Sequence, residues 1–225
     1  MKRFEIARKI ERIARSLTAA TIDEETMARL DEAEKQGKKY ILWKKEGSLW
    51  RIMACKNFNG VWMGAIGGLI ESEKNLDHKG NCWVYEDAKV YGNAKVYGKA
   101  RVFDNAQVYG NAAIYNEATV FGNAKVYGNA GVFGEAEVCG NARVYGNAEV
   151  CDAAQVYNNA KVYDAQVYDY AQVYGNAQVY DEAEVCENVR VYGEAKVNNN
   201  AKVYGDARIY GNADVGYNTN KEKNN

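Results

Sequence analysis

The chain has 225 residues and a formal net charge of −1, which allows one or two domains and gives no overall attraction to nucleic acid or an anionic membrane. It contains no proline, and its five cysteines lack paired spacing, a pattern that excludes a disulfide framework and fits a reducing compartment. The N-terminus is charged rather than an apolar signal core, and the longest apolar run, residues 61–70, is too short to span a bilayer. We therefore expect a cytoplasmic protein without membrane contact.

The first predicted element is an amphipathic helix. Within residues 4–17, four apolar side chains share one helical face: Ile6, Ile10, Ile13 and Leu17. The cations of this helix are Arg8, Lys9, Arg12 and Arg15. A second helix is predicted to open with a capping box at Thr21 and Glu24 and to end near Gln36.

The next segment predicts a small β-rich cap. Residues 39–45 and 48–55 form a hairpin pattern around Glu46-Gly47, and a third short strand is expected at residues 61–63. The first coil of a repeat protein leaves an open strand edge that invites aggregation. We expect the cap to cover that edge and the helices to pack on it. In the alternative, the basic first helix docks a partner.

The rest of the chain repeats a six-residue phrase of the form Ala-x-Val-Tyr-Gly-Asn. Val or Ile recurs every six residues from Val84 to Val162 and, after the loss of one residue near Asp164, from Val167 to Val215, giving 23 units. Ala and Val lie two residues apart and face the interior, whereas the residue between them faces outward. Such short units are stable only when stacked, so the pattern predicts a solenoid.

The corners of the coil follow from the same phrase. The residue two after Val is Gly, Asn or Asp in every unit from Gly92 to Gly211 except Glu187, and these types tolerate a left-handed backbone. Three corners close a triangular coil, so the units predict about 7–8 coils with an interior too full for a ligand. The shortened unit at Asp164 is interpreted as a tight corner. The predicted domains are helices over 1–37, a β-rich cap over 38–80, a β-helix over 81–217 and a disordered polar tail over 218–225.

Sorting the residue after each Val by coil gives three outer columns. The unbroken column, the aromatic edge, consists of Tyr91, Tyr109, Tyr127, Tyr145, Tyr163 and Tyr180. The other two contain aromatic residues interrupted by Cys139, Cys151 and Cys186. Rings one coil apart are placed to stack, and the following asparagines are placed to form amide ladders: Asn93, Asn105, Asn111, Asn123 and Asn129. These ladders either hold the coil together or offer an aromatic binding edge.

Two segments resemble a known family. At residues 67–76, Gly-Gly-Leu-Ile-Glu-Ser-Glu-Lys-Asn-Leu, and at residues 80–85, Gly-Asn-Cys-Trp-Val-Tyr, the chain resembles the YdcK-like hexapeptide-repeat proteins. The resemblance extends back through residues 49–52 and forward over the repeats, and residues 1–37 lie outside it. It implies a left-handed parallel β-helix, often a trimer, in a bacterial or phage setting. It also implies an acyltransferase label, with acetyl-CoA or another acyl-CoA as the acyl donor.

The residues that such chemistry needs are sparse. Acyltransferases of this fold place a histidine general base on a coil, whereas the single histidine, His78, precedes the first coil. His78 is a weak candidate base, and a histidine in a surface turn is the simpler interpretation. Cys151 and Cys186 share a column but lie two coils apart, about 10 Å by strand spacing, too far for a disulfide or one zinc ion. We therefore expect no catalytic residue, metal or cofactor.

One outward column is basic. This binding stripe contains Lys89, Gln107, Lys125, Arg143, Lys161 and Lys196, with Gln178 between the last two. Like charges about 4.8 Å apart repel, so the stripe beside the aromatic edge suggests a surface for an anionic partner. The simpler alternative is a solvated face balanced by acids at nearby corners, such as Glu117 and Glu135.

Three functions follow from these features. The first is a non-catalytic β-helical scaffold that binds a protein, for example a phage or mobile-element accessory that blocks a complex of its bacterial host. The second is an acyl-CoA-dependent acyltransferase, as the resemblance implies. The third is nucleic-acid contact through the stripe, since basic and aromatic residues together can follow a phosphate backbone.

Overall fold

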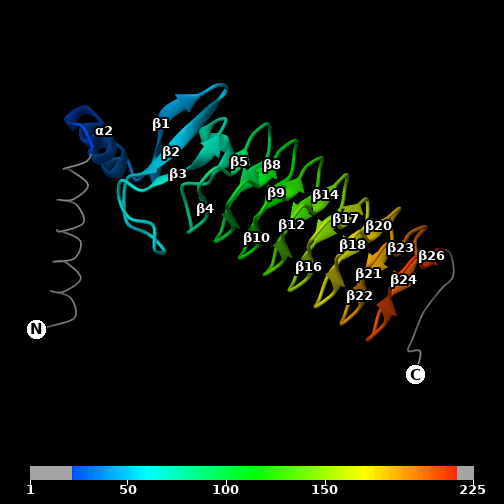
Figure 1. Ribbon diagram of the computed structural model, residues 1–225. Helices are drawn as coiled ribbons and strands as arrows, with labels where there is room; N and C mark the ends of the chain where they lie inside the picture. The colour runs from blue at the N-terminus through cyan, green and yellow to red at the C-terminus, as the bar shows by residue number, and fades with distance from the viewer. Residues whose placement is uncertain (1–21, 217–225) are drawn as a thin grey trace, which may run out of the picture.

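The computed structural model describes residues 22–216, which form a helix, a β-rich cap and a β-solenoid (Figure 1). In this part of the chain the solenoid strands β4 to β26 number 23, one for each predicted hexad, and they stack as parallel strands on three faces. The predicted β-helix is therefore confirmed as a triangular solenoid of about eight turns.

Each face takes every third strand. The first face contains β5 (Lys89–Val90), β8 (Gln107–Val108), β11 (Lys125–Val126), β14 (Arg143–Tyr145), β17 (Lys161–Tyr163), β20 (Gln178–Tyr180), β23 (Lys196–Val197) and β26 (Asp214–Val215). The second face contains β4 (Trp83–Val84), β7 (Arg101–Val102), β10 (Thr119–Val120), β13 (Glu137–Val138), β16 (Gln155–Val156), β19 (Gln172–Val173), β22 (Arg190–Val191) and β25 (Arg208–Ile209). The third face contains β6 (Lys95–Val96), β9 (Ala113–Ile114), β12 (Gly131–Val132), β15 (Glu149–Val150), β18 (Gln166–Val167), β21 (Glu184–Val185) and β24 (Lys202–Val203).

Backbone hydrogen bonds join each coil to the next. On the first face, the N–H of Lys125 donates to the carbonyl of Ala142 at 2.9 Å, and that of Tyr127 donates to Val144 at 3.0 Å. The Ala and Val columns between them are buried from Ala88 to Val203. The interior is thus packed with small aliphatic side chains, as the hexad predicts.

The corners adopt the expected left-handed backbone. Among the described residues, every position two after an inward Val or Ile has a positive φ, from Glu86 to Gly211. Glu187 follows the rule with φ 58°, although it is not a favoured type. Its carboxylate accepts a hydrogen bond from the N–H of Gly205, the same corner one coil later, at 2.9 Å. A carboxylate at this corner therefore satisfies a backbone donor of the next coil.

The missing residue shortens one corner without breaking the solenoid. Strands before it pair 18 residues apart, as in Lys125 with Arg143, and strands across it pair 17 apart, as in Lys161 with Gln178. Asp164 has φ 48°, and its carboxylate accepts hydrogen bonds from the backbone and side-chain nitrogens of Asn147. This confirms a tight corner at Asp164.

Two asparagine ladders run along the corners. One ladder contains Asn93, Asn111, Asn129 and Asn147, with amide bonds of 2.9 to 3.1 Å between neighbours. The other contains Asn123, Asn141, Asn159 and Asn176. Asn105 lies one coil before Asn123, but no amide bond joins these two among the described residues.

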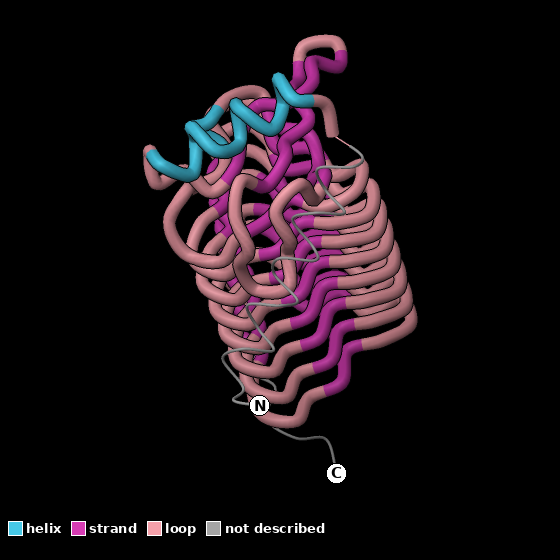
Figure 2. The backbone as a smooth tube through the Cα atoms, turned by 90° about the vertical axis from the view of Figure 1, so that its left-hand side faces the viewer, coloured by secondary structure: helices cyan, strands magenta, loops and turns pink. Residues whose placement is uncertain are grey.

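The cap agrees with the sequence in its hairpin and differs in two details. Strands β1 (Tyr40–Glu46) and β2 (Leu49–Ala54) pair antiparallel, as expected. Helix α2 (Glu24–Lys35) starts later than predicted, because its N-cap is Asp23, whose carboxylate accepts a hydrogen bond from the N–H of Thr26 at 2.7 Å. Figure 2 shows α2 lying across the end of the stack of coils.

The third strand of the cap is not at residues 61–63 as predicted. Val61 and Met63 are buried, but Val61 forms only an isolated bridge with Phe58, and strand β3 is Ile66–Ile70. Strand β3 pairs antiparallel with β2 and parallel with β5, so it joins the cap to the first face. The alternation at residues 61–63 arises from a turn that packs two side chains inward.

Strand β3 contains the Gly-Gly pair because it lies too close to the first coil for side chains. A Cβ on Gly67 would lie 2.6 Å from a ring carbon of Trp83, and a Cβ on Gly68 would lie 2.5 Å from a methyl of Val84 and 2.7 Å from the carbonyl oxygen of Ala88. These glycines are therefore required by packing between the cap and the solenoid.

Arg51 clamps the same junction. From β2, its guanidinium forms a bidentate pair with Glu46 at 2.7 and 2.9 Å. It also donates to the carbonyl of Glu86 at 2.7 Å and to the carboxylate of Asp87 at 3.2 Å, at the first corner of the solenoid. The planar fork of arginine suits this set of acceptors.

We predict that Gly68→Ala destabilises the protein by about 1–3 kcal/mol, the range typical of overpacking, since the Ala88 carbonyl is backbone and cannot move aside. Denaturant unfolding monitored by circular dichroism measures the change. The matched control is Gly131→Ala on the third face, where the nearest atoms to an added Cβ are 3.7 Å away and the neighbouring strand already carries Ala113. Equal stability of the two variants would contradict the packing argument.

Candidate functional site

The binding stripe and the aromatic edge lie side by side on the first face. Along a strand, residues two apart point the same way, so the side chains of Lys125 and Tyr127 both leave this face. Pairing of β5, β8, β11, β14, β17, β20 and β23 aligns the stripe residues from Lys89 to Lys196 in one row. The structure therefore brings together the two sets of residues that the sequence singled out.

The cations of the stripe are not neutralised. None of its five cations forms an ion pair with any described residue: Lys89, Lys125, Arg143, Lys161 and Lys196. Elsewhere the solenoid does pair charges between coils, as in Lys99 with Glu117 at 2.6 Å and Lys202 with Glu184 at 2.8 Å. Glu117, expected to balance the stripe, thus binds a corner lysine instead. Three cations occupy consecutive coils about 4.8 Å apart, which concentrates positive potential on this face.

The aromatic edge is a continuous stack. Its neighbouring rings have centroids 4.9 to 5.0 Å apart and interplanar angles of 1 to 13°. Ring faces are therefore occupied by other rings, and the edges and hydroxyls point outward. Burial raises the pKa of Tyr91, Tyr109, Tyr145 and Tyr163, so these hydroxyls are neutral donors at physiological pH. At the end of the stack, Asn198 donates to the hydroxyl of Tyr180 at 3.1 Å.

The three cysteines of the outer columns offer no activated nucleophile. Cys139, Cys151 and Cys186 are half-buried, and all five cysteines of the chain are free thiols. Burial, together with the neighbouring Asp152 carboxylate, raises the pKa of Cys151 to about 12. A thiol with so high a pKa is almost wholly protonated at neutral pH and reacts slowly.

His78 lies in a bend before the first coil, as the sequence places it, but its ring packs against the cap and is only 25% exposed. Its ring stacks on Tyr40 with centroids 4.2 Å apart, and its Nδ1 accepts a hydrogen bond from the backbone N–H of Lys39 at 3.1 Å. Its Nε2 is buried 3.7 Å from a carboxylate oxygen of Glu73. The imidazole is thus fixed between the hairpin and the first coil.

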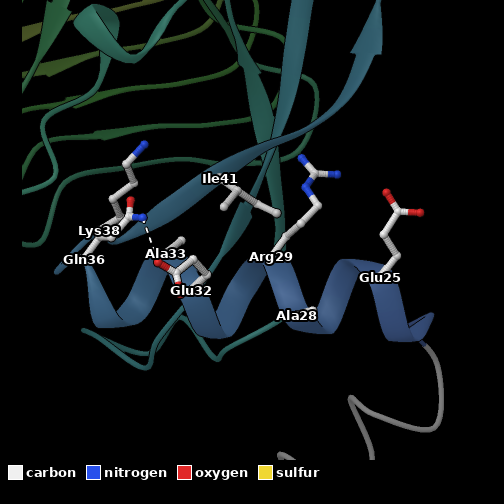
Figure 3. Close-up of a pocket in the computed structure, with 8 residues that line it drawn as sticks. All are labelled: Glu25, Ala28, Arg29, Glu32, Ala33, Gln36, Lys38 and Ile41. Carbon is white, nitrogen blue, oxygen red and sulfur yellow. Dashed lines mark hydrogen bonds between the residues drawn. The ribbon is translucent and has the colours of Figure 1, made fainter.

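Two open grooves lie outside the first face. Figure 3 shows the first, about 440 Å³, where Ala28, Ala33 and Ile41 form an apolar floor beside α2. On its polar rim the amide of Gln36 donates to the carboxylate of Glu32, as the dashed line marks, and Arg29 donates to the carbonyl of Leu42. Lys38 pairs with Glu73 outside the groove. This groove presents no paired acid and base.

The second groove, about 930 Å³, follows from the shortened corner. It is lined by acidic and amide side chains from four successive corners: Asn147, Asp164, Asp181, Glu182, Asn199 and Asn200. Glu184 and Lys202, which pair with each other at 2.8 Å, line it from the third face. Within residues 22–216 no group of His, Cys, Asp or Glu side chains has the arrangement of a metal site.

The basic helix with Arg8, Lys9, Arg12 and Arg15 lies outside the described residues. Within the described range, no helix has both the length and the apolar character to cross a bilayer.

Comparison with known proteins supports the resemblance to YdcK-like repeat proteins. A family model described as the YdcK beta solenoid repeat matches residues 136–152. A 47-residue stretch is 40% identical to a protein of Escherichia coli (strain K12) named "Uncharacterized acetyltransferase YdcK". This stretch covers 21% of the present chain and 14% of that protein. The chain is thus similar to the repeat family over residues 136–152 and to the E. coli protein over one short stretch.

We predict that His78 makes the fold sensitive to mild acid. Burial lowers the pKa of His78 against an opposing effect of Glu73, so below about pH 6.5 the unfolded chain binds a proton that the folded chain does not. Stability is full above that pH and declines as the pH falls toward the folded pKa. Urea unfolding at pH 7.5 and 5.5 should show a larger loss for the wild type than for His78→Asn, which keeps an acceptor near Lys39. Equal losses would exclude His78 as the cause.

Proposed function

We propose that the chain is a non-catalytic β-solenoid binding protein whose first face contacts an acidic surface of a protein partner. The observation that carries the proposal is the row of five unpaired cations beside six stacked tyrosines. Nothing in the coil requires cations at these outward positions, since the third face carries Ala113 and Gly131 there.

A protein partner suits the physical properties of this face. Neighbouring cations repel each other in the free protein, and carboxylates on a partner would relieve that repulsion. The tyrosines are already immobilised by stacking, so little side-chain entropy is lost on binding. Their exposed hydroxyls and ring edges add hydrogen bonds and apolar contact, the combination that makes Tyr frequent at interfaces.

Nucleic acid suits the face less well. Single-stranded nucleic acids bind aromatic residues by stacking bases on open ring faces, and here the faces along the column are covered by neighbouring rings. Only the cations would contribute, through contacts with phosphates. The chain as a whole is slightly negative, which disfavours a purely electrostatic interaction.

The setting of this interaction is also a proposal. The family resemblance suggests a phage or mobile-element accessory that blocks a host complex in the bacterial cytoplasm, acting as a single chain or as a trimer. A rigid solenoid supports this role, because an extended preorganised face binds without rearrangement.

Acetyl transfer is the second candidate, favoured by the name of the E. coli relative. It would need a general base near the acyl acceptor. His78 is the only histidine of the chain, and its stacking on Tyr40 and bond from Lys39 leave Nδ1 occupied. These contacts support a structural role for His78 and make binding the better-supported function.

We predict that Lys125→Glu with Arg143→Glu abolishes capture of the partner from the native host, because the change reverses two adjacent cations of the stripe. The matched control is Arg190→Glu with Arg208→Glu, an adjacent exposed pair on the second face with the same change in net charge. Affinity capture with protein identification, at low and high salt, measures the outcome.

Three results would contradict this prediction. Retention of the partner by the stripe variant would exclude the first face. Loss of the captured species on nuclease treatment would identify nucleic acid instead. A change of oligomeric state in the stripe variant alone, without a heterologous partner, would identify the face as a contact between copies.

We also predict that calorimetric titration with acetyl-CoA gives no heat of binding to the full chain. The reason is that the solenoid interior is filled and the two open grooves lack a base with a free acceptor nitrogen. Saturable binding together with acetyl transfer that is lost in His78→Asn would establish the enzyme and overturn the proposal.

A further inference from the structure

A buried lysine and a buried cysteine meet where the cap joins the solenoid. Lys39 precedes β1, Cys82 precedes β4, and their side chains are 1% and 0% exposed. The Nζ of Lys39 lies 3.2 Å from the Sγ of Cys82 and donates to the Cys82 carbonyl at 2.8 Å. It also lies 5.3 Å from the ring centroid of Phe58. No carboxylate among the described residues forms an ion pair with this ammonium group.

The surroundings of the pair favour uncharged partners. Burial lowers the pKa of Lys39 and raises the pKa of Cys82, so the neutral amine and the neutral thiol both gain population. A neutral amine has a lone pair and is a nucleophile, as in enzymes that use desolvated lysines. Fixed contact replaces a bimolecular encounter and raises the effective concentration of the amine at the sulfur.

We propose that Lys39 and Cys82 form a covalent Nζ–Sγ sulfenamide link when a hydroperoxide oxidises the thiol. In the first step the neutral amine takes the thiol proton, and the thiolate attacks one peroxide oxygen, so that the O–O bond breaks and an S–O bond forms. The departing hydroxide takes the proton back from the ammonium and leaves as water, which restores the neutral amine. In the second step the amine attacks the sulfenic sulfur, an N–S bond forms, and the S–O bond breaks. The hydroxyl then leaves with one amine proton as a second water. Overall, one hydrogen peroxide is reduced to two waters, and the protein loses two hydrogen atoms.

The other cysteines provide internal comparisons. Cys55 is buried like Cys82 but has no lysine nitrogen within hydrogen-bonding distance among the described residues, whereas Cys139, Cys151 and Cys186 are more accessible and also lack one. Peroxide should therefore give ordinary oxygenated products at the accessible thiols and a cross-link at Cys82. The link would close a loop over the 43-residue separation of Lys39 and Cys82 and tie the hairpin to the first coil.

The test treats the full chain with hydrogen peroxide, alkylates the remaining thiols and maps peptides by mass spectrometry. The expected product is a cross-linked pair of peptides containing Lys39 and Cys82, lighter than their sum by two hydrogens. It should resist trypsin after Lys39 and revert on treatment with dithiothreitol. The cross-linked protein should also unfold at a higher denaturant concentration than the reduced protein.

Two variants, each lacking one of the two reacting groups, serve as controls. Cys82→Ala places the residue that the same column carries at Ala100 and Ala118, so it should fold and give no cross-link. Lys39→Met removes the amine and should yield sulfenic or sulfinic acid at Cys82. Peroxide treatment of the wild type that leaves Cys82 a free thiol, or converts it only to oxygenated acids with Lys39 still cleavable, overturns the proposal. An equal yield of cross-link in urea-unfolded protein overturns it as well.

Discussion

The hydrogen bond from each backbone N–H to a carbonyl one coil later is the interaction on which the structure depends. It fixes the spacing of the coils and therefore brings identical positions of the hexad into columns. Stacked tyrosines, asparagine ladders and rows of like charge all follow from that repeat. Even the shortened unit at Asp164 keeps these bonds, because the lost residue comes from a corner and not from a strand.

Because each coil accepts hydrogen bonds from the coil before it, the first coil leaves unpaired carbonyls on all three faces. The cap satisfies these carbonyls in a different way on each face. On the first face, strand β3 pairs with β5. On the third face, the amide of buried Asn75 donates to the carbonyls of Gly92 and Ala94, and Leu76 bridges to Val96. On the second face, the ammonium of Lys39 donates to the carbonyl of Cys82. Residues 67–76 and 80–85, which carry the family resemblance, are therefore largely the parts that end a solenoid.

The sequence predicts the structural features that recur in every coil and misses the contacts that occur only once. The hexad predicts the strand count, the buried columns, the left-handed corners and the stacking of the aromatic edge, because each recurs every coil. The pairing of β3 with β5, the contacts of Arg51 with the first corner and the Lys39–Cys82 contact join residues up to 43 positions apart without any repeat. For the candidate site, residue spacing predicts the columns, but it does not predict that the cations of the stripe lack ion pairs. Only side-chain geometry shows it: Glu117, for example, pairs with Lys99 at a corner between the other two faces.

Folding of the coil constrains the inward and corner residues but not the outward mid-strand residue. Inward Ala and Val and left-handed corners recur on all three faces. The outward mid-strand residue varies, and the strands pair in the same register whether it is Gly131, Thr119 or Arg143. The stripe repeats a cation in five coils at a position that folding leaves free, and the proposed contact with an acidic partner rests on that repetition. The second and third faces carry mixed outward residues and aromatic columns interrupted by cysteine, so among the described residues the row of five cations beside an unbroken tyrosine column occurs on the first face.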